Sequence, residues 1–253
     1  MILSDRKEWV SVRPPILMAS QVEAAIEAFS SGKPVMIFDS SFREQETDLL
    51  WPASAATPSI MRRLRKDCGG LLFLAIGNEV GELFGLPWLQ DIHSHPNLVE
   101  ENPILSELIT DDLKYDSKSA FTLSLNHRET FTGITDKDRA LTTRRFGELT
   151  NELFSNGTDH LKARKALGKE FRTPGHIPLC RESPGGLNSR QGHTELAVAM
   201  ARLAGLPPCT IGAEMLQPEG DGALAVEDAR KYAIKNGIPM LTGEDILDVF
   251  GII

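Results

Sequence analysis

The feature that most constrains the fold of this chain is the alternation of short apolar runs with helical stretches along its whole length. The run at 71–76 is continuously apolar, as expected of a strand that is buried on both faces. Further strands are predicted at 33–39, 121–126, 209–216 and 238–241, and a short apolar run occupies 177–180. Strands and helices that interleave in this way predict one α/β (α+β) domain, with a mixed β-sheet between helical layers in a three-layer arrangement.

Helical periodicity and capping residues separate these runs. Helices are predicted at 21–30, from Thr57 to Cys68, from Thr135 to about Phe154, from His193 to Leu203, at 226–236 and after Thr242. Ser20 is the expected N-cap of the first helix, and Gly32 is the residue at which it should stop.

Other segments of the sequence show weaker signals of secondary structure. The stretches 81–116 and 155–169 show no clear element. Residues 1–15 are polar and end in a Pro-Pro pair, so we expect an N-terminal arm there. Because no repeat, low-complexity tract or linker divides the rest, residues 16–253 are predicted to form a single domain.

Composition narrows the function classes. The 253 residues carry a formal net charge of −8, which argues against a general nucleic-acid binder because such proteins need a basic surface. No apolar stretch approaches the ~20 residues that span a bilayer, so no membrane association is expected. Cys68, Cys180 and Cys209 have no CxxC spacing, and they fit the reduced thiols of a cytoplasmic protein.

One charged run lies between two apolar stretches, Arg43-Glu44-Gln45-Glu46-Thr47-Asp48. In an extended chain its three carboxylates would share one face, although a sharp loop could also bring them together. Two like charges about 4 Å apart cost roughly 1 kcal/mol in water and roughly 4 kcal/mol near a protein surface. The run therefore indicates either a solvated strand edge or a site for a divalent cation.

A second stretch, Arg190-Gln191-Gly192-His193-Thr194, opens a predicted helix. The first turn of a helix offers free backbone N–H groups and the positive end of the helix dipole. Arg190 adds a guanidinium suited to phosphate, Thr194 adds a hydroxyl, and Gly192 allows close backbone approach. The stretch predicts a phosphate cradle with a histidine inside it, or alternatively a plain helix cap with solvated side chains.

His193 in its neutral form could also bind a metal ion. Together with Glu44 it would make an oxygen-rich site that suits Mg²⁺ or Mn²⁺ better than zinc. Glu214 ends a predicted strand and is either a general base or a solvent-facing carboxylate.

Several further polar residues have open roles. Thr132 and Thr135 could offer hydroxyls to a substrate, although Thr135 is already explained as a helix cap. His176 is ambiguous between a packed turn residue and a group that supports a site. The pair His93 and His95 could bind a metal ion or lie on the surface.

Four motifs follow one another in order. They are Arg43-Glu44-x-Glu46-Thr47-Asp48, Asn126-His-Arg-Glu-Thr-Phe-Thr-Gly-Ile-Thr-Asp-x-Asp-Arg139, Phe171-Arg-x-Pro-Gly175 and Arg190-Gln-Gly-His-Thr-Glu195. Together they resemble the motifs of the 3,4-dihydroxy-2-butanone 4-phosphate synthases, a family of riboflavin biosynthesis, and the resemblance extends over about 21–251. The bacterial pattern usually has glycine at the position of Thr47. A threonine there resembles the archaeal branch of the family, and the chain resembles the monofunctional form of the enzyme.

The resemblance implies roles for the site residues. Glu44 and His193 would bind one or two Mg²⁺ (or Mn²⁺) ions. The substrate D-ribulose 5-phosphate would be held by Arg43, Asp48, Thr132, Arg190, Gln191, Gly192, Thr194 and Glu214. The catalytic set would be Glu44, Glu46, Asp48, His193 and Glu214, with Glu214 in proton transfer and Glu46 as a further acid or base.

The resemblance also implies a reaction and an assembly. A lyase of this family converts ribulose 5-phosphate to L-3,4-dihydroxy-2-butanone 4-phosphate and releases C4 as formate, through an enediol, loss of water and a skeletal shift. The family is typically a homodimer with residues of both subunits at each site. Bacterial members often carry a cysteine where Phe73 aligns, so no thiol role is expected there.

Two other functions remain open at this point. One is a different metal-dependent sugar-phosphate isomerase or aldolase that uses the same enediol chemistry. The other is a non-catalytic phosphosugar-binding module. Replacement of one or more of Glu44, Asp48, His193 and Glu214 would favour the binding module. All four are present, so this alternative ranks last.

Overall fold

The computed structural model describes residues 15–109, 112–114, 116 and 118–253, and these residues form a seven-stranded sheet. The strands are β1 (Val35–Phe38), β2 (Thr47–Pro52), β3 (Phe73–Ile76), β4 (Phe121–His127), β5 (Phe171–Arg181), β6 (Cys209–Glu214) and β7 (Met240–Thr242), in the spatial order β4-β5-β3-β6-β2-β1-β7. β1 is parallel to β7 and β3 to β5, whereas the other neighbours are antiparallel. The predicted mixed sheet is confirmed.

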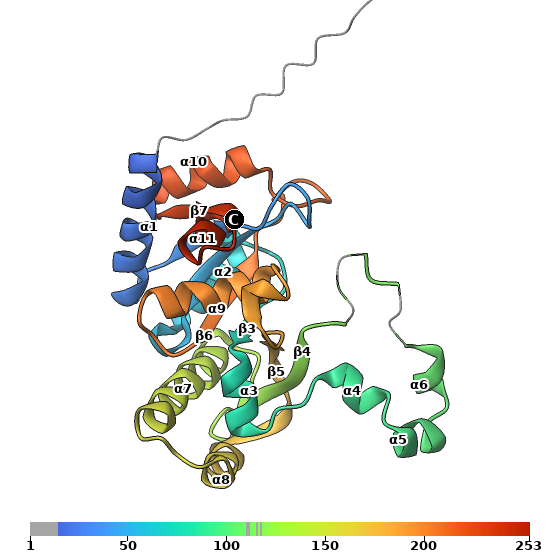
Figure 1. Ribbon diagram of the computed structural model, residues 1–253. Helices are drawn as coiled ribbons and strands as arrows, with labels where there is room; N and C mark the ends of the chain where they lie inside the picture. Colours follow the sequence, from blue (N-terminus) through green and yellow to red (C-terminus); the bar gives the residue numbers. More distant parts are fainter. Residues whose placement is uncertain (1–14, 110–111, 115, 117) are drawn as a thin grey trace, which may run out of the picture.

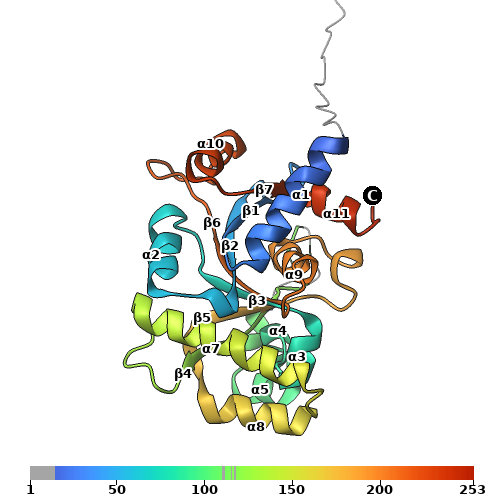
Figure 2. The ribbon, with the colours of Figure 1, turned by 90° about the vertical axis from the view of Figure 1, so that its left-hand side faces the viewer.

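Helices cover both faces of this sheet, which gives the expected three layers (Figure 1 and Figure 2). One layer holds α1 (Pro15–Ser30), α9 (His193–Leu203) and α11 (Gly243–Val249). The other holds α2 (Pro58–Asp67), α3 (Asn78–Phe84), α7 (Asp136–Ser155), α8 (His160–Glu170) and α10 (Val226–Asn236). Two short 3-10 turns complete the elements of the main body, η1 (Ala53–Ala55) and η2 (Gly186–Asn188).

The strands build two hydrophobic cores, one on each face. In β2, Leu49 and Trp51 pack in the core shared with α2 and α7, whereas Leu50 packs in the core shared with α1 and α9. Successive side chains of a strand point to opposite faces. A strand with helices on both sides therefore needs apolar residues at every position, which explains the continuous apolar runs in the sequence.

Three predicted helix starts are confirmed at their caps. The side chains of Thr57, Thr135 and Thr242 each accept a hydrogen bond from the backbone N–H three residues further on. The predicted stop at Gly32 is also confirmed, because this residue follows α1 with a φ of 74°. Gly237 follows α10 in the same left-handed conformation, with a φ of 61°.

Two local predictions need correction. The first helix begins at Pro15, so Ser20 lies inside α1 and is not its N-cap. Proline is favourable in the first turn of a helix, and Pro15 opens a helix here. The arm expected for 1–15 lies, apart from Pro15, outside the described residues. The segment 155–169, where no element was apparent, holds most of α8.

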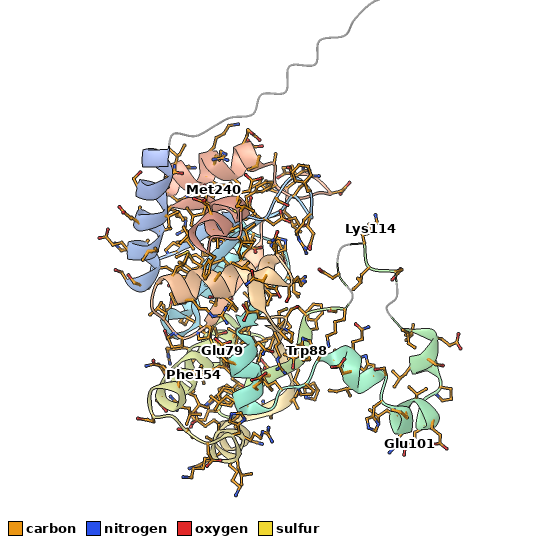
Figure 3. The ribbon with its side chains drawn as sticks, in the orientation of Figure 1. Glu79, Trp88, Glu101, Lys114, Phe154 and Met240 are labelled. Carbon is orange, nitrogen blue, oxygen red and sulfur yellow. The ribbon has the colours of Figure 1, made fainter. Side chains whose placement is uncertain are left out.

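A small helical projection stands away from the sheet (Figure 1). It consists of α4 (Leu89–His93), α5 (Pro96–Glu101) and α6 (Ile104–Glu107). Trp88 lies at its base and Glu101 near its far end (Figure 3). The Trp88 ring lies between two cations, with Lys118 and Arg181 each 4.0 Å from its centroid, and this contact ties the projection to the sheet. Among the described residues, no helix combines the length and the apolar character that crossing a membrane requires.

Candidate active site

The acidic run folds as a tight loop, not as a strand. Both carboxylate oxygens of Asp39, a buried residue at the end of β1, accept backbone N–H groups, from Glu44 at 2.9 Å and from Glu46 at 3.0 Å. Gln45 between them has φ 59°, a left-handed conformation that turns the chain sharply. Of the two alternatives for this run, the extended chain is not found before residue 47, where β2 begins, and the sharp loop is what brings the carboxylates together.

His193 is the centre of the site. It is the first residue of α9, and its Nδ1 lies 2.6 Å from Oδ2 of Asp48 in β2. Asp48 is 1% exposed and His193 is 9% exposed. Burial by itself lowers the pKa of His193, but the charge and hydrogen bond of Asp48, followed by Glu44 and Asp39, raise it to about 10. The carboxylate of Asp48 thus fixes the ring and holds a proton on Nδ1.

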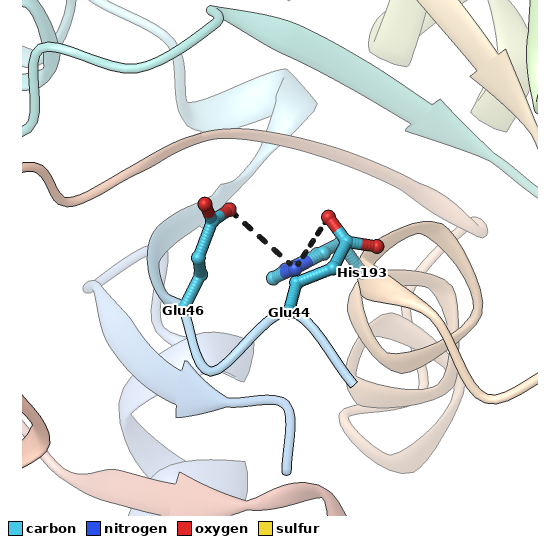
Figure 4. A group of neighbouring side chains, drawn as sticks. All are labelled: Glu44, Glu46 and His193. Atoms are coloured by element: carbon cyan, nitrogen blue, oxygen red, sulfur yellow. Dashed lines mark ion pairs between the residues drawn. The ribbon is translucent and has the colours of Figure 1, made fainter. Parts of the chain in front are cut away.

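The other ring nitrogen faces two glutamates (Figure 4). Nε2 of His193 lies 3.6 Å from Oε2 of Glu44 and 3.9 Å from Oε2 of Glu46, and this buried nitrogen has no hydrogen-bond partner. Octahedral ligands about 2.1 Å from Mg²⁺ are separated by roughly 3 Å when adjacent and roughly 4 Å when opposite. The three donor atoms, all within 4.8 Å of one another, therefore have a spacing that suits such an ion.

This trio extends the predicted metal pair of Glu44 and His193 by one residue, Glu46. Burial raises the pKa of Glu46, and the neighbouring carboxylates raise it further against the opposing effect of His193. Such mutual repulsion among acidic groups is relieved by a divalent cation. No other group of three or more potential ligands occurs within the described part of the chain.

An arginine cluster, made up of Arg43 and Arg190, adjoins the same site. Arg190 donates from one terminal nitrogen to the buried Glu195, and from the other to Asp116 at 2.8 Å. Arg43 donates to the same oxygen of Asp116 at 3.4 Å. Two arginines from the two predicted motifs therefore meet at the carboxylate of Asp116. Burial alone would raise the pKa of Asp116, but Arg190 and Arg43 lower it below its usual value.

Glu214 occupies the end of β6, directly opposite Asp48 in β2. Burial, and then the charge of Asp48, raise the pKa of Glu214 to about 7. Glu214 lines a pocket of about 240 Å³, and the polar residues around that pocket also include Glu44, Asp116, Arg190, His193 and Thr194.

Most of the predicted site residues therefore converge. Glu44, Glu46, Asp48, His193, Glu214, Arg43, Arg190 and Thr194 surround or adjoin this pocket. Gly192 is buried at the N-cap of α9, whereas Gln191 is exposed and does not line the pocket.

Thr132 does not line this pocket within the same molecule. Phe121 at the start of β4 lines the pocket, and β4 leads away from it for six residues, roughly 20 Å, before the loop that carries Thr132. The backbone N–H of Thr132 instead donates to the carboxylate of Asp138, beside the start of α7. His176 lies in the same region and hydrogen bonds with Asn126.

Three residues with clear roles in this geometry were missed. Asp39 shapes the acidic loop, Glu195 holds Arg190, and Asp116 joins the two arginines. A carboxylate that follows a buried strand directly, as Asp39 does, is the one signal that the sequence offered. His93 and His95 are exposed in the projection and belong to no cluster of potential ligands among the described residues.

A site that combines a histidine–glutamate cluster with partly buried arginines has the composition needed to bind a metal ion beside an anionic small molecule. Comparison with known proteins makes the assignment specific: the chain belongs to the 3,4-dihydroxy-2-butanone 4-phosphate synthase family, whose model matches residues 23–249. The family prediction is confirmed.

Relatives of this name cover nearly the whole chain. The protein of Methanosarcina acetivorans is 40% identical over 232 residues, which is 90% of both chains. That of Methanothermobacter thermautotrophicus is 36% identical over 229 residues, or 90% of this chain and 95% of the relative. The relative from Ralstonia nicotianae is 32% identical over 234 residues, so these two archaeal proteins are the more similar, as the Thr47 motif suggested.

Solved structures agree on the fold. A cation-free 3,4-dihydroxy-2-butanone 4-phosphate synthase has a TM-score of 0.68 and 26% identity, and the match covers 91% of this chain and 96% of that one. A synthase in complex with two magnesium ions has a TM-score of 0.67 and 25% identity, with 90% and 95% covered. The single-domain α+β fold is shared with these enzymes.

Proposed function

We propose that this protein is a lyase that converts D-ribulose 5-phosphate to L-3,4-dihydroxy-2-butanone 4-phosphate and formate, a step of riboflavin biosynthesis. The observation that carries the proposal is His193, held by Asp48 on one side with its unpartnered Nε2 facing Glu44 and Glu46 on the other. That arrangement suits one or two Mg²⁺ (or Mn²⁺) ions beside the arginine cluster.

The two ends of the site would divide the work of binding. Glu44, Glu46 and His193 would hold the metal, which when bound supplies Lewis-acid stabilisation of negative charge on substrate oxygens. At the other end of the site, the phosphate would be held by Arg190, Arg43 and the start of α9 at Thr194. An open-chain ketose phosphate carries oxygens along its whole length and can reach both ends at once.

Asp48 and Glu214 would act on the carbon chain between these ends. A pKa of about 7 lets the Glu214 carboxyl group exist in both forms near neutral pH, as a group that takes and returns protons must. The Oδ1 atom of Asp48 is buried without a hydrogen-bond partner, while Oδ2 holds His193. We assign Oδ1 of Asp48 the role of accepting a hydrogen bond from a substrate hydroxyl.

A homodimer would complete the site. The loop that carries Thr132 exposes two apolar side chains beside it, Phe131 with 94% of its surface free and Ile134 with 53%. Apolar side chains this exposed are typical of surfaces covered by a partner. A second copy could bring its own Thr132 loop to this pocket, and the proposed dimer would be seen by sedimentation equilibrium.

Formate release tests the function. The purified protein with Mg²⁺ should release formate from ribulose 5-phosphate, and EDTA should stop the release. His193→Ala and Glu44→Gln should lose turnover and keep the wild-type melting profile, whereas Glu23→Gln on an exposed face of α1 should match wild type. Absence of formate from the Mg²⁺-loaded wild-type protein would reject the proposal.

A further inference from the structure

Asp116 occupies the centre of the arginine cluster. Its Oδ2 accepts from Arg190 at 2.8 Å and from Arg43 at 3.4 Å, and all three side chains are only 15–16% exposed. Asp116 and Arg190 both line the pocket. One carboxylate oxygen thus stands where both guanidinium groups converge.

The donors of Arg190 are only partly used by this contact. One terminal nitrogen is taken by Glu195 and the other by Asp116, while the buried Nε has no hydrogen-bond partner. Nε and a terminal nitrogen on the same edge of a guanidinium form a fork that binds two oxygens of one anion. Asp116 satisfies a single donor of Arg190, whereas a phosphate group has enough oxygens for both donors of such a fork and for Arg43.

The balance of charges also indicates that Asp116 occupies the place of a phosphate group. The two positive charges of Arg43 and Arg190 are matched by the two negative charges of Asp116 and the buried Glu195, and Glu44 adds a further carboxylate 3.6 Å from Arg43. With Asp116 in place, the cluster has no net positive charge to offer a phosphate dianion. When that carboxylate leaves, the net charge of the remaining groups rises from −1 to 0.

We propose that Asp116 is an internal anion that occupies the phosphate position on Arg43 and Arg190 and is exchanged for the phosphate of the substrate. The proposal rests on the proposed function, because it takes the arginine cluster as the phosphate end of the site. The exchange makes Asp116 a specificity-determining residue. A sugar without a phosphate group cannot replace its carboxylate, whereas a phosphosugar gains the unused donor of Arg190 in addition.

The test uses inorganic phosphate as the probe and calorimetry of the Mg²⁺-loaded protein as the readout. Asp116→Asn removes the competing charge and keeps the shape of the side chain. Asp112→Asn makes the same charge change at an exposed position of the same segment and serves as the matched control. Asp116→Ser is a second variant that lacks an amide to lie against the arginines, and thermal melting establishes that each variant is folded.

We expect Asp116→Asn and Asp116→Ser to bind phosphate about tenfold more tightly than wild type, because a like charge has left the site. Asp112→Asn should remain within about twofold of wild type, since exposed charges are screened. The KM for ribulose 5-phosphate should fall in the Asp116 variants, with a smaller change in kcat.

Phosphate binding that is unchanged or weaker in the folded Asp116 variants would overturn the proposal, and so would an equal gain in Asp112→Asn. Absence of phosphate binding in all forms would overturn it as well. The proposed reaction is judged separately by formate. Wild-type protein that binds phosphate and releases no formate rejects the reaction, and formate release with unchanged phosphate affinity in Asp116→Asn rejects only the exchange.

Discussion

Replacing Asp48 with asparagine tests whether this carboxylate prepares His193 for a metal ion. Asp48 is 1% exposed, and its Oδ2 lies 2.6 Å from Nδ1 of His193, which leaves Nε2 directed at Glu44 and Glu46. Asparagine keeps the size of the side chain and removes the charge. A hydrogen bond to a charged group is worth about 1.5–3 kcal/mol, which corresponds to roughly 10–150-fold in affinity.

We expect Asp48→Asn to bind Mn²⁺ about 10–100-fold more weakly than wild type at pH 9, the range typical for loss of a carboxylate behind a histidine ligand. Free Mn²⁺ is measured by electron paramagnetic resonance. At pH 7 the deficit should be smaller. Although burial opposes it, Asp48 raises the pKa of His193 to about 10, so in the wild-type protein a proton competes more strongly at Nε2.

The exposed carboxylate Asp248 on α11 provides the control, because Asp248→Asn removes one negative charge far from His193 in sequence and leaves Asp48 in place. This variant should match the wild-type Mn²⁺ affinity. If Asp48→Asn is folded and binds Mn²⁺ as tightly as wild type at pH 9, Asp48 does not prepare His193 for a metal ion.

Three further predictions concern the loop, the proton-transfer group and the core. Asp39→Asn should weaken Mn²⁺ binding about tenfold, because an amide oxygen can replace only one of the two carboxylate acceptors that shape the loop; an unchanged affinity would contradict this. Burial and Asp48 raise the pKa of Glu214 from 4.5 to about 7, so its ionisation costs stability as the pH rises through that interval and the cost is complete above pH 7. Glu214→Gln should therefore raise the free energy of unfolding in EDTA by about 1–3 kcal/mol at pH 8 and leave it unchanged at pH 4, and it should abolish formate release; equal urea midpoints at pH 8 would count against the raised pKa. Phe146→Ala should lower the free energy of unfolding by about 3–5 kcal/mol in urea titrations, since this fully buried ring packs against Phe84 and Phe171; a loss below about 1 kcal/mol would contradict that packing.

Where the sequence predicted the fold, the controlling interactions are local. The threonine caps at Thr57, Thr135 and Thr242 each act within four residues, and a continuous apolar run depends only on burial of both faces of one strand. The first helix was placed too short because Pro14-Pro15 indicates both the end of an extended arm and the first turn of a helix. α8 was missed because its buried face is narrow, with Ala163 and Leu167 as its buried residues.

In the site, too, features set by local sequence were predicted, and features set by long-range contacts were not. His193, Glu44 and Glu214 were found because their residue types and motif positions carry the signal. The fold of the acidic run was not, because the carboxylate of Asp39 ties the loop back to the strand before it. Asp116 lies in a stretch with no periodicity, and its contact with Arg190 spans 74 residues. Such long-range pairs leave no local pattern to read.

We propose that this pocket expels one carbon of a phosphosugar. The most direct measurement is carbon-13 NMR of the products formed from ribulose 5-phosphate labelled at C4, with Mg²⁺ and the wild-type protein. We expect the label to appear in formate and the remaining four carbons to stay together in a phosphorylated product. A label retained in a five-carbon sugar phosphate, or in a fragment from a simple aldol cleavage, would contradict it.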